Sequence, residues 1–470
     1  MIRCHQAPFG GLAGFLPIGV MLSMIGLEYT GSDSLALLTG ILALLTVAAF
    51  VPQAKASRLA FVAVGLALVL WAAASRPDWV QVTMTAAQRG AMVIALFTAL
   101  SAIRSAAMGS AEILDCGRFL ARQPPGLRYV ALTIGGHLFA LILLYGSISL
   151  LGSLVTENAA REPDAVLRRH RIRRMMVAIQ RGFASTLCWS PLGFSMAITI
   201  SIVPGASWPD VVIPCIVSAV LMMTVGWALD MIFKPRLATP PPTRSPETGR
   251  WLVQLRPLLL LLGVVMSGVL ILHLWTGVEV IGAVMSLVPA IAVLWIGLQP
   301  RPHGMGRSAW IGSQVLQFIT RDIPGYRGEI VLLFMAGFIG SLGSILLVPV
   351  VQNQGVDLNA LPPLLIMVAT VWLVPLTGQL GMNPILAVSL LVPLLPSPQA
   401  MGISPVALVA AITGGWALSG ATSPFTASVL ISASLGGVTA REAGIGWNGL
   451  YTLVMGSILS AWVLILALIL

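Results

Sequence analysis

Long apolar runs separated by short polar loops make up most of this chain. A run of about 20 mainly apolar residues is long enough to cross a bilayer as an α-helix. We therefore predict an all-α polytopic membrane protein with about eleven transmembrane helices. The predicted spans lie near residues 10–27, 34–51, 58–75, 89–106, 172–203, 210–233, 257–275, 279–298, 329–352, 404–435 and 446–470.

Two further apolar stretches, 129–156 and 361–396, differ from simple spans because helix-breaking or small residues interrupt each near its centre. The interruptions are Gly146-Ser147-Ile148-Ser149 in the first and Gly381-Met382-Asn383-Pro384 in the second. Irregular backbone at membrane depth is tolerated only beside protein or a water-filled cavity. We predict that each stretch is a re-entrant hairpin, which enters the membrane and returns to the same side.

Arginine placement assigns a side to each hairpin. Cytoplasmic loops carry an excess of Lys and Arg near helix ends. Arginines flank the first hairpin within 104–128 and 161–174, whereas 353–360 and 397–403 contain neither Lys nor Arg. The first hairpin is therefore predicted to enter from the cytoplasm and the second from outside, with a cytoplasmic N-terminus.

A duplicated Ser-Pro break joins the two halves of the chain. Pro191 and Pro424 are 233 positions apart (424 − 191), and each follows a serine within a predicted membrane helix. Without gaps, residues 178–202 match residues 411–435 at 9 of 25 positions. Because opposite hairpins precede these helices, we predict two inverted-topology repeats. Such repeats place a transporter's substrate near the bilayer midplane.

The repeats define the expected domain organisation, in which each repeat has scaffold spans, a hairpin and a broken helix. The expected segments are an extra N-terminal span (1–33), repeat 1 (34–233), a cytoplasmic linker (234–256) and repeat 2 (257–470). Repeat 1 contains the inner hairpin 129–156 and the broken helix 172–203. Repeat 2 contains the outer hairpin 361–396 and the broken helix 404–435.

Composition agrees with a multi-pass membrane protein. The chain is 57% hydrophobic and only 9% charged, whereas soluble domains carry about 25% charged residues. The net charge of +10 comes from arginines in loops and follows from topology, so we expect no nucleic-acid partner. The four cysteines, Cys4, Cys116, Cys188 and Cys215, have no metal-type spacing.

The helix breaks supply the candidate binding chemistry. Hairpin tips and broken helices leave backbone N–H and C=O groups unpaired, and the N-termini of half-helices favour anions. Prolines would hold the breaks open, because proline removes a helical hydrogen bond. The predicted substrate-binding residues are Gly146, Ser147, Ser149, Ser190, Asn383, Thr422 and Ser423, and the helix-break prolines are Pro191, Pro384 and Pro424.

Each of these residues also has a purely structural interpretation. Serine and threonine in membrane helices often bond the preceding turn, and proline often only kinks a helix. His137 could titrate during transport, but a buried histidine with satisfied nitrogens is the better interpretation. No Asp or Glu occurs in the two hairpins or the two broken helices. A cation held by neutral oxygens, such as Na⁺ near Ser147 and Asn383, is therefore the simpler coupling hypothesis.

The order of hairpin, broken helix and repeat resembles the ion transporter superfamily, and within it the divalent-anion/sodium symporters of the citrate/dicarboxylate type. Within the outer hairpin, the segment from Met382 to Pro393 is similar in shape to that family's tip. Ala421 to Thr426 sits where the helix that follows the hairpin is unwound in that family. The resemblance implies an elevator-type fold, an anionic substrate, sodium coupling and a homodimer. Neither tip carries the family's Ser-Asn-Thr triplet, which separates this chain from its dicarboxylate specificity.

These features predict a secondary active transporter of the inner membrane, not an enzyme. The expected partners are a small anion, either an organic acid or an oxyanion, and the bilayer. Coupling would be to Na⁺ or H⁺, with no organic cofactor. One alternative is the permease subunit of a binding-protein-dependent carrier; another is a polyprenyl-linked sugar polymerase or transferase. Substrate, direction and coupling ion stay open.

Overall fold

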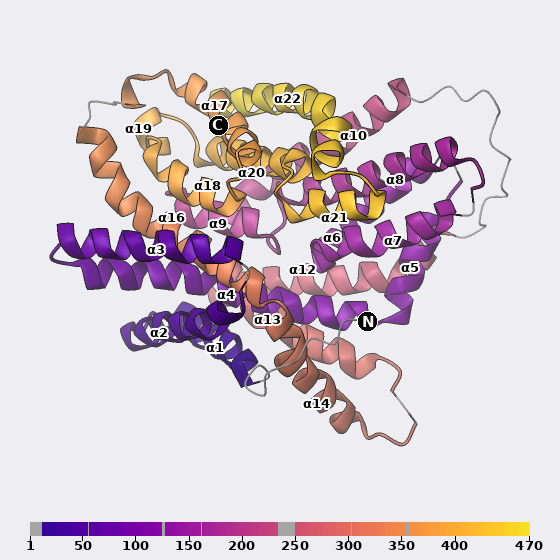
Figure 1. The fold of residues 1–470 in the computed structure, drawn as a ribbon, viewed down its shortest axis with the longest axis horizontal. Coiled ribbons are helices and arrows are strands. Elements are labelled where there is room, and N and C mark those ends of the chain that lie inside the picture. Colours follow the sequence, from indigo (N-terminus) through magenta and orange to yellow (C-terminus); the bar gives the residue numbers. More distant parts are fainter. Residues whose placement is uncertain are drawn as a thin grey trace. The chain divides into compact units, whose positions relative to one another are not determined.

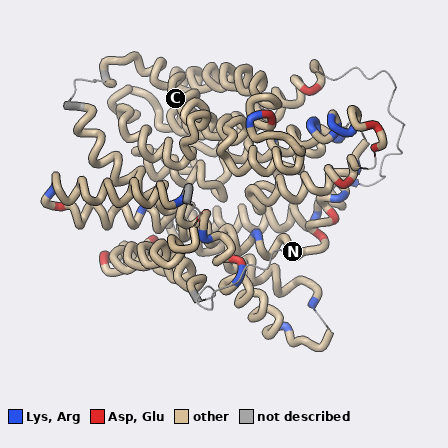
Figure 2. Tube along the Cα trace, viewed as in Figure 1, with Lys and Arg blue, Asp and Glu red and all other residues tan. Residues whose placement is uncertain are grey.

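The computed structural model describes residues 12–54, 56–124, 127–160, 162–233, 250–301, 303–353 and 358–470. These residues form helices and connections without a β-strand, and nine of the helices among them are long and apolar enough to span a membrane. Charged residues lie mostly near helix ends and in connections (Figure 2). The chain is thus an all-α polytopic membrane protein, as predicted. Of the expected linker, residues 234–249 lie outside the described residues.

Chain contacts divide the structure into two compact units (Figure 1). Unit 1 takes the described residues within Met1–Ser110, Val264–Val356 and Ser389–Leu394, and unit 2 takes those within Ala111–Gly263, Asp357–Val388 and Leu395–Leu470. Each unit draws on both halves of the sequence. The division therefore cuts across the expected sequential segments, whose assignment as repeats stays a prediction.

Unit 1 is built around two long helices, α4 and α16, which pack against each other. Its helices are α1 (Phe15–Thr30), α2 (Asp33–Phe50), α3 (Ala56–Ser75), α4 (Trp79–Met108), α13 (Val280–Leu298), α14 (Arg307–Gln317), α15 (Ile323–Gly325) and α16 (Arg327–Asn353). The predicted span 89–106 is the core of α4, which begins ten residues earlier, at Trp79. Hydropathy missed this first part because it is polar, although nothing in it breaks a helix.

Unit 2 contains the predicted hairpin 129–156, the part of the predicted hairpin 361–396 that lies outside Ser389–Leu394, and both predicted broken helices. Its helices are α5 (Ala111–Ala121), α6 (Arg128–Leu143), α7 (Gly146–Ala160), α8 (Ala165–Thr186), α9 (Phe194–Ile202), α10 (Trp208–Ile232), α11 (Trp251–Gln254), α17 (Pro363–Gln379), α19 (Pro398–Met401), α20 (Pro405–Thr422), α21 (Ala427–Gly436) and α22 (Trp447–Ile469). Two helices, α12 (Arg256–Thr276) and α18 (Pro384–Leu391), contribute residues to both units. The broken helix 172–203 thus corresponds to α8 and α9, and 404–435 to α20 and α21.

Each hairpin packs against the broken helix that follows it, α6 on α8 and α17 on α20 (Figure 1). Glycines at positions that the sequence match aligns allow the close approach. A Cβ at Gly182 of α8 would overlap the carbonyl oxygen of Thr133, and one at Gly415 of α20 would lie 2.6 Å from the carbonyl oxygen of Val371. Small residues let membrane helices approach closely enough for van der Waals packing. The two halves of unit 2 therefore use the same contact.

Because backbone cannot move aside cheaply, Gly182→Ala and Gly415→Ala should each destabilise the protein by about 1–3 kcal/mol. Gly449→Ala is the matched control, since a Cβ there meets only the Ile445 side chain at 3.5 Å. It should leave stability unchanged or slightly raised. Thermal unfolding in detergent measures the effect. Wild-type melting of both tight-glycine variants would contradict the close packing.

Candidate functional site

The first break lies between α8, which ends at Thr186, and α9, which begins at Phe194. Ser190 is buried in this connection, and its Oγ accepts a hydrogen bond from the backbone N–H of Leu192 at 3.2 Å. The carbonyl of Trp189 accepts one from the indole N–H of Trp208 at 3.0 Å. The break is therefore held by a serine turn and an aromatic donor.

The second break lies between α20, which ends at Thr422, and α21, which begins at Ala427. Ser423 occupies the position equivalent to Ser190 and makes the same turn, with its Oγ accepting from Phe425 N–H at 3.3 Å. Its hydroxyl also donates to the carbonyl of Gly378 at 2.6 Å. Thr422 Oγ1 donates to Leu418 O within its own helix, which is the structural role weighed above.

The outer hairpin tip reaches the second break. It runs from the end of α17 to Asn383, which caps α18 by accepting a hydrogen bond from Ile385 N–H at 2.8 Å. Pro384 follows as the first helical residue, where its missing N–H costs nothing. Gly381 has φ +91°, a left-handed conformation suited to glycine, and a Cβ there would lie 3.8 Å from the ring of Phe425.

The segment 129–156, predicted as the inner hairpin, turns earlier than predicted. The expected interruption, Gly146 to Ser149, forms the first turn of α7, while Leu144 and Tyr145 make the connection. Leu144 has φ 49°, which is costly for a side chain with a Cβ. Sequence composition pointed to the glycine and serines, but glycine is tolerated at a helix start. Ser147 is buried and its Oγ donates to Leu144 O at 2.7 Å, whereas Ser149 is half-buried.

His137 joins the inner hairpin to the first break. Its Nδ1 lies 2.7 Å from Ser185 Oγ, and its Nε2 accepts from the indole N–H of Trp189 at 3.3 Å. Ser185 Oγ donates its own proton to Gly182 O, so Nδ1 must be the ring donor. Both nitrogens of a neutral imidazole are thereby satisfied, which fits the structural interpretation of this residue.

The structure groups the predicted residues only in part. All seven predicted binding residues and all three prolines belong to unit 2. The second break contacts the outer hairpin through Ser423 and Gly378. Within the described part of the chain, no hydrogen bond joins one predicted binding residue to another. Three buried hydroxyls near the breaks, those of Ser195, Thr199 and Ser419, have no partner among the described residues.

Sequence reasoning missed Arg181, the buried cation of unit 2. Its side chain is only 6% exposed and extends from α8 toward α6, α10 and α22. It donates to Tyr129 Oη at 3.0 Å, to Gly226 O at 3.2 Å and to Asn448 Oδ1 at 2.9 Å. Its guanidinium carbon lies 4.2 Å from the ring centre of Tyr451. The predicted span 172–203 also contains Arg173 and Arg174 at its start, but Arg181 lies within its apolar part, and that position was the signal that could have found it.

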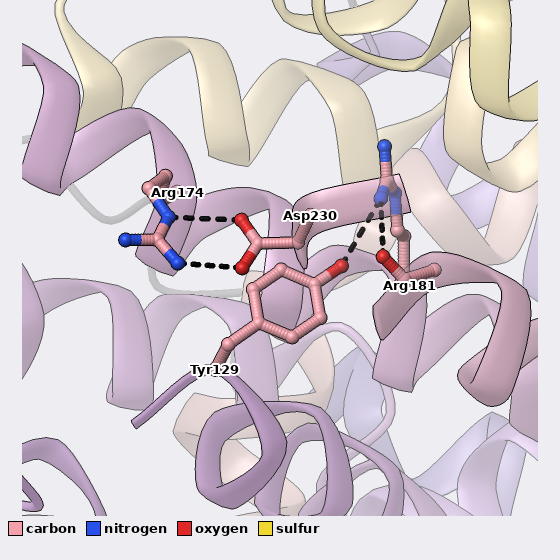
Figure 3. A network of polar contacts seen from close by, with 5 residues as sticks. Tyr129, Arg174, Arg181 and Asp230 are labelled. Carbon is pink, nitrogen blue, oxygen red and sulfur yellow. Dashed lines mark hydrogen bonds and ion pairs between the residues drawn. The ribbon is translucent and has the colours of Figure 1, made fainter. Parts of the chain in front are cut away.

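An ion pair lies in the neighbourhood of this arginine (Figure 3). Arg174 donates to both carboxylate oxygens of Asp230, at 2.8 and 2.5 Å. A bidentate pair of this kind fixes orientation as well as charge. Asp230 is thus bonded to Arg174, and among the described residues no acid pairs with Arg181 itself.

Comparison with known proteins shows what this fold resembles. No family model and no curated protein sequence matches the chain. The solved YdaH transporter of Alcanivorax borkumensis is similar at 15% identity and TM-score 0.53, over 87% of this chain and 98% of that one. MtrF of Neisseria gonorrhoeae, from a class described as antimetabolite efflux pumps, is similar at 14% identity and TM-score 0.51, over 88% and 95%. The chain therefore shares its fold with membrane transporters.

Proposed function

We propose that this protein is a secondary active transporter that moves a small anion, an organic acid or an oxyanion, across the inner membrane. The observation that carries this proposal is the pair of helix breaks in unit 2, each closed by the same serine turn at equivalent positions. Broken helices in both halves of a membrane protein are the usual place of a transporter's substrate. The fold shared with two solved transporters supports the same conclusion.

An anionic substrate fits the chemistry around the breaks. The half-helices α9 and α21 begin at the breaks, so their first N–H groups point toward them. Three buried hydroxyls have no hydrogen-bond partner among the described residues and could bond a ligand. They belong to Ser195 and Thr199 on α9 and to Ser419 near the end of α20. Arg181 adds a positive charge inside the same unit. These groups could bind a carboxylate or oxyanion.

Coupling to Na⁺ or H⁺ is part of the proposal. Neutral oxygens of Ser147 and Asn383 would hold a sodium ion. Ser147 Oγ donates its proton to Leu144 O, and Asn383 Oδ1 accepts one hydrogen bond from Ile385 N–H. Each oxygen therefore keeps a lone pair that could bind a cation. We further propose elevator-type movement of unit 2, a cytoplasmic N-terminus and a homodimer, as the resemblance to divalent-anion/sodium symporters implies. A permease subunit that needs a separate substrate-binding protein is the competing proposal.

If the breaks bind substrate, Asn383→Ala and the double variant Ser190→Ala with Ser423→Ala should abolish transport while leaving membrane insertion intact. The hydroxyls and the amide would be lost without removing the prolines that open the helices. Transport in proteoliposomes and the yield of folded protein would be measured together. Ser457→Ala, an exposed serine that bonds only its own helix, is the control. Wild-type rates in the site variants would defeat the site assignment.

Ligand binding should also raise thermal stability, because a ligand that binds only the folded state adds about RT ln(1 + [L]/Kd). Purified protein would be screened by thermal shift against organic acids and oxyanions, with and without Na⁺. We expect at least one anion to raise the melting temperature, with a larger shift in sodium.

Uptake into sodium-free proteoliposomes that equals uptake with sodium would exclude sodium coupling. Transport that appears only with an added binding protein would favour the permease subunit.

A further inference from the structure

The end of α20 has a backbone carbonyl that its own helix does not satisfy. In a continuous helix the carbonyl of Ala421 would accept from the N–H of Phe425. That N–H instead bonds Ser423 Oγ in the turn of the second break. The carbonyl accepts from the side-chain amide of Gln180 at 3.1 Å, and Gln180 is fully buried on α8. A side chain from the first half of the sequence therefore caps the second break.

Gln180 is the last member of a directed chain of hydrogen bonds. Asn448 on α22 donates from Nδ2 to Gln180 Oε1 at 3.2 Å, and its Oδ1 accepts from Nε of Arg181 at 2.9 Å. A guanidinium can only donate, so it fixes which end of the Asn448 amide faces it. That orientation leaves Asn448 Nδ2 facing Gln180 and turns the Gln180 amide group toward Ala421. The chain has one direction, from the cation to the break.

A second link of Asn448 strengthens the connection to the break. Its Nδ2 also donates to Ala443 O at 3.2 Å, in the π-helical segment Glu442–Gly446 that precedes α22. Gly444 of this segment packs so closely on Thr422 that a Cβ would overlap the Thr422 carbonyl oxygen. The last two residues of α20, Ala421 and Thr422, are thus held by the same assembly.

The hydrogen-bonded chain from Arg181 to Ala421 has no equivalent at the first break. The repeat positions equivalent to Gln180 and Arg181 are Thr413 and Gly414 (180 + 233 and 181 + 233), which cannot build the same chain. The first break is held by Trp208 and the His137–Trp189 contact instead. A structural tie common to both repeats would be expected to recur at equivalent positions. Its restriction to one break points to a role specific to that break.

We propose that Arg181, Asn448 and Gln180 form a positioning chain that sets the backbone geometry at Thr422-Ser423-Pro424. The inference rests on the proposed function, in which this segment binds the anion. Burying an arginine inside a membrane unit is expensive, and such residues usually serve function. Here the arginine acts through two amides and need not touch the substrate. Its loss would loosen the second break and weaken substrate binding.

The test uses Gln180→Glu, which keeps size and shape and, as a carboxylate, retains an acceptor for Asn448 but removes the donor to Ala421. Hydrogen–deuterium exchange of residues 417–428 should become about ten-fold faster, because a buried carbonyl loses its partner. Exchange of residues 184–194 at the first break should stay unchanged. Gln180→Met repeats the test without adding a charge, and should give the same result if the glutamate variant does not fold.

Thr370→Val is the matched control, since Thr370 is buried in α17 and bonds only its own helix. It should leave exchange at 417–428 unchanged, even if the melting temperature falls. In transport, both Gln180 variants should raise the half-saturating substrate concentration about ten-fold, with the maximal rate within about two-fold of wild type. Exchange at 417–428 equal to that of the control in both variants would overturn the proposal. This exchange is measured without substrate, so its result tests the positioning chain even if no transported substrate is found.

Discussion

Backbone polar groups at the two helix breaks must find partners inside an apolar unit, and the rest of unit 2 is arranged around that constraint. No lipid can bond an N–H or C=O group at membrane depth. At each break, one backbone N–H is satisfied locally, because the serine Oγ accepts a hydrogen bond from the N–H two residues later. One further carbonyl at each break accepts a hydrogen bond from another helix, from Trp208 at the first break and from Gln180 at the second. A break of this kind cannot exist without its neighbours.

Close packing places those neighbours within reach. Gly182 and Gly415 bring each broken helix against the backbone of its own hairpin. At that separation His137 can reach the first break, and Ser423 can reach the carbonyl of Gly378 in the outer hairpin. Both halves of unit 2 therefore have the serine turn and the close glycine contact, whereas the hydrogen-bonded chain from Arg181 reaches only the second break. The two breaks are alike in their turns and different in what holds them.

How far the sequence predicts this structure depends on the range of the interactions involved. Apolar runs placed most helices within a few residues, and proline with serine marked both breaks, because these signals are local. The turn at Leu144 was missed because no residue there favours it. Arg181 and Gln180 were missed as well. The position of Arg181 in an apolar run was a local signal, but the partners Asn448 and Ala421 lie 267 and 241 residues away, and no pattern near residue 180 reveals these partners.

The central claim is that the two halves of unit 2 are related repeats that enter the membrane from opposite sides. Side-specific labelling of single cysteines at Ala160, the end of α7, and Ala400, in α19, tests it most directly, because both side chains are exposed. An impermeant maleimide applied to intact cells should label position 400 and not 160, and inside-out vesicles should show the reverse. Labelling of both positions from the same side would contradict the account.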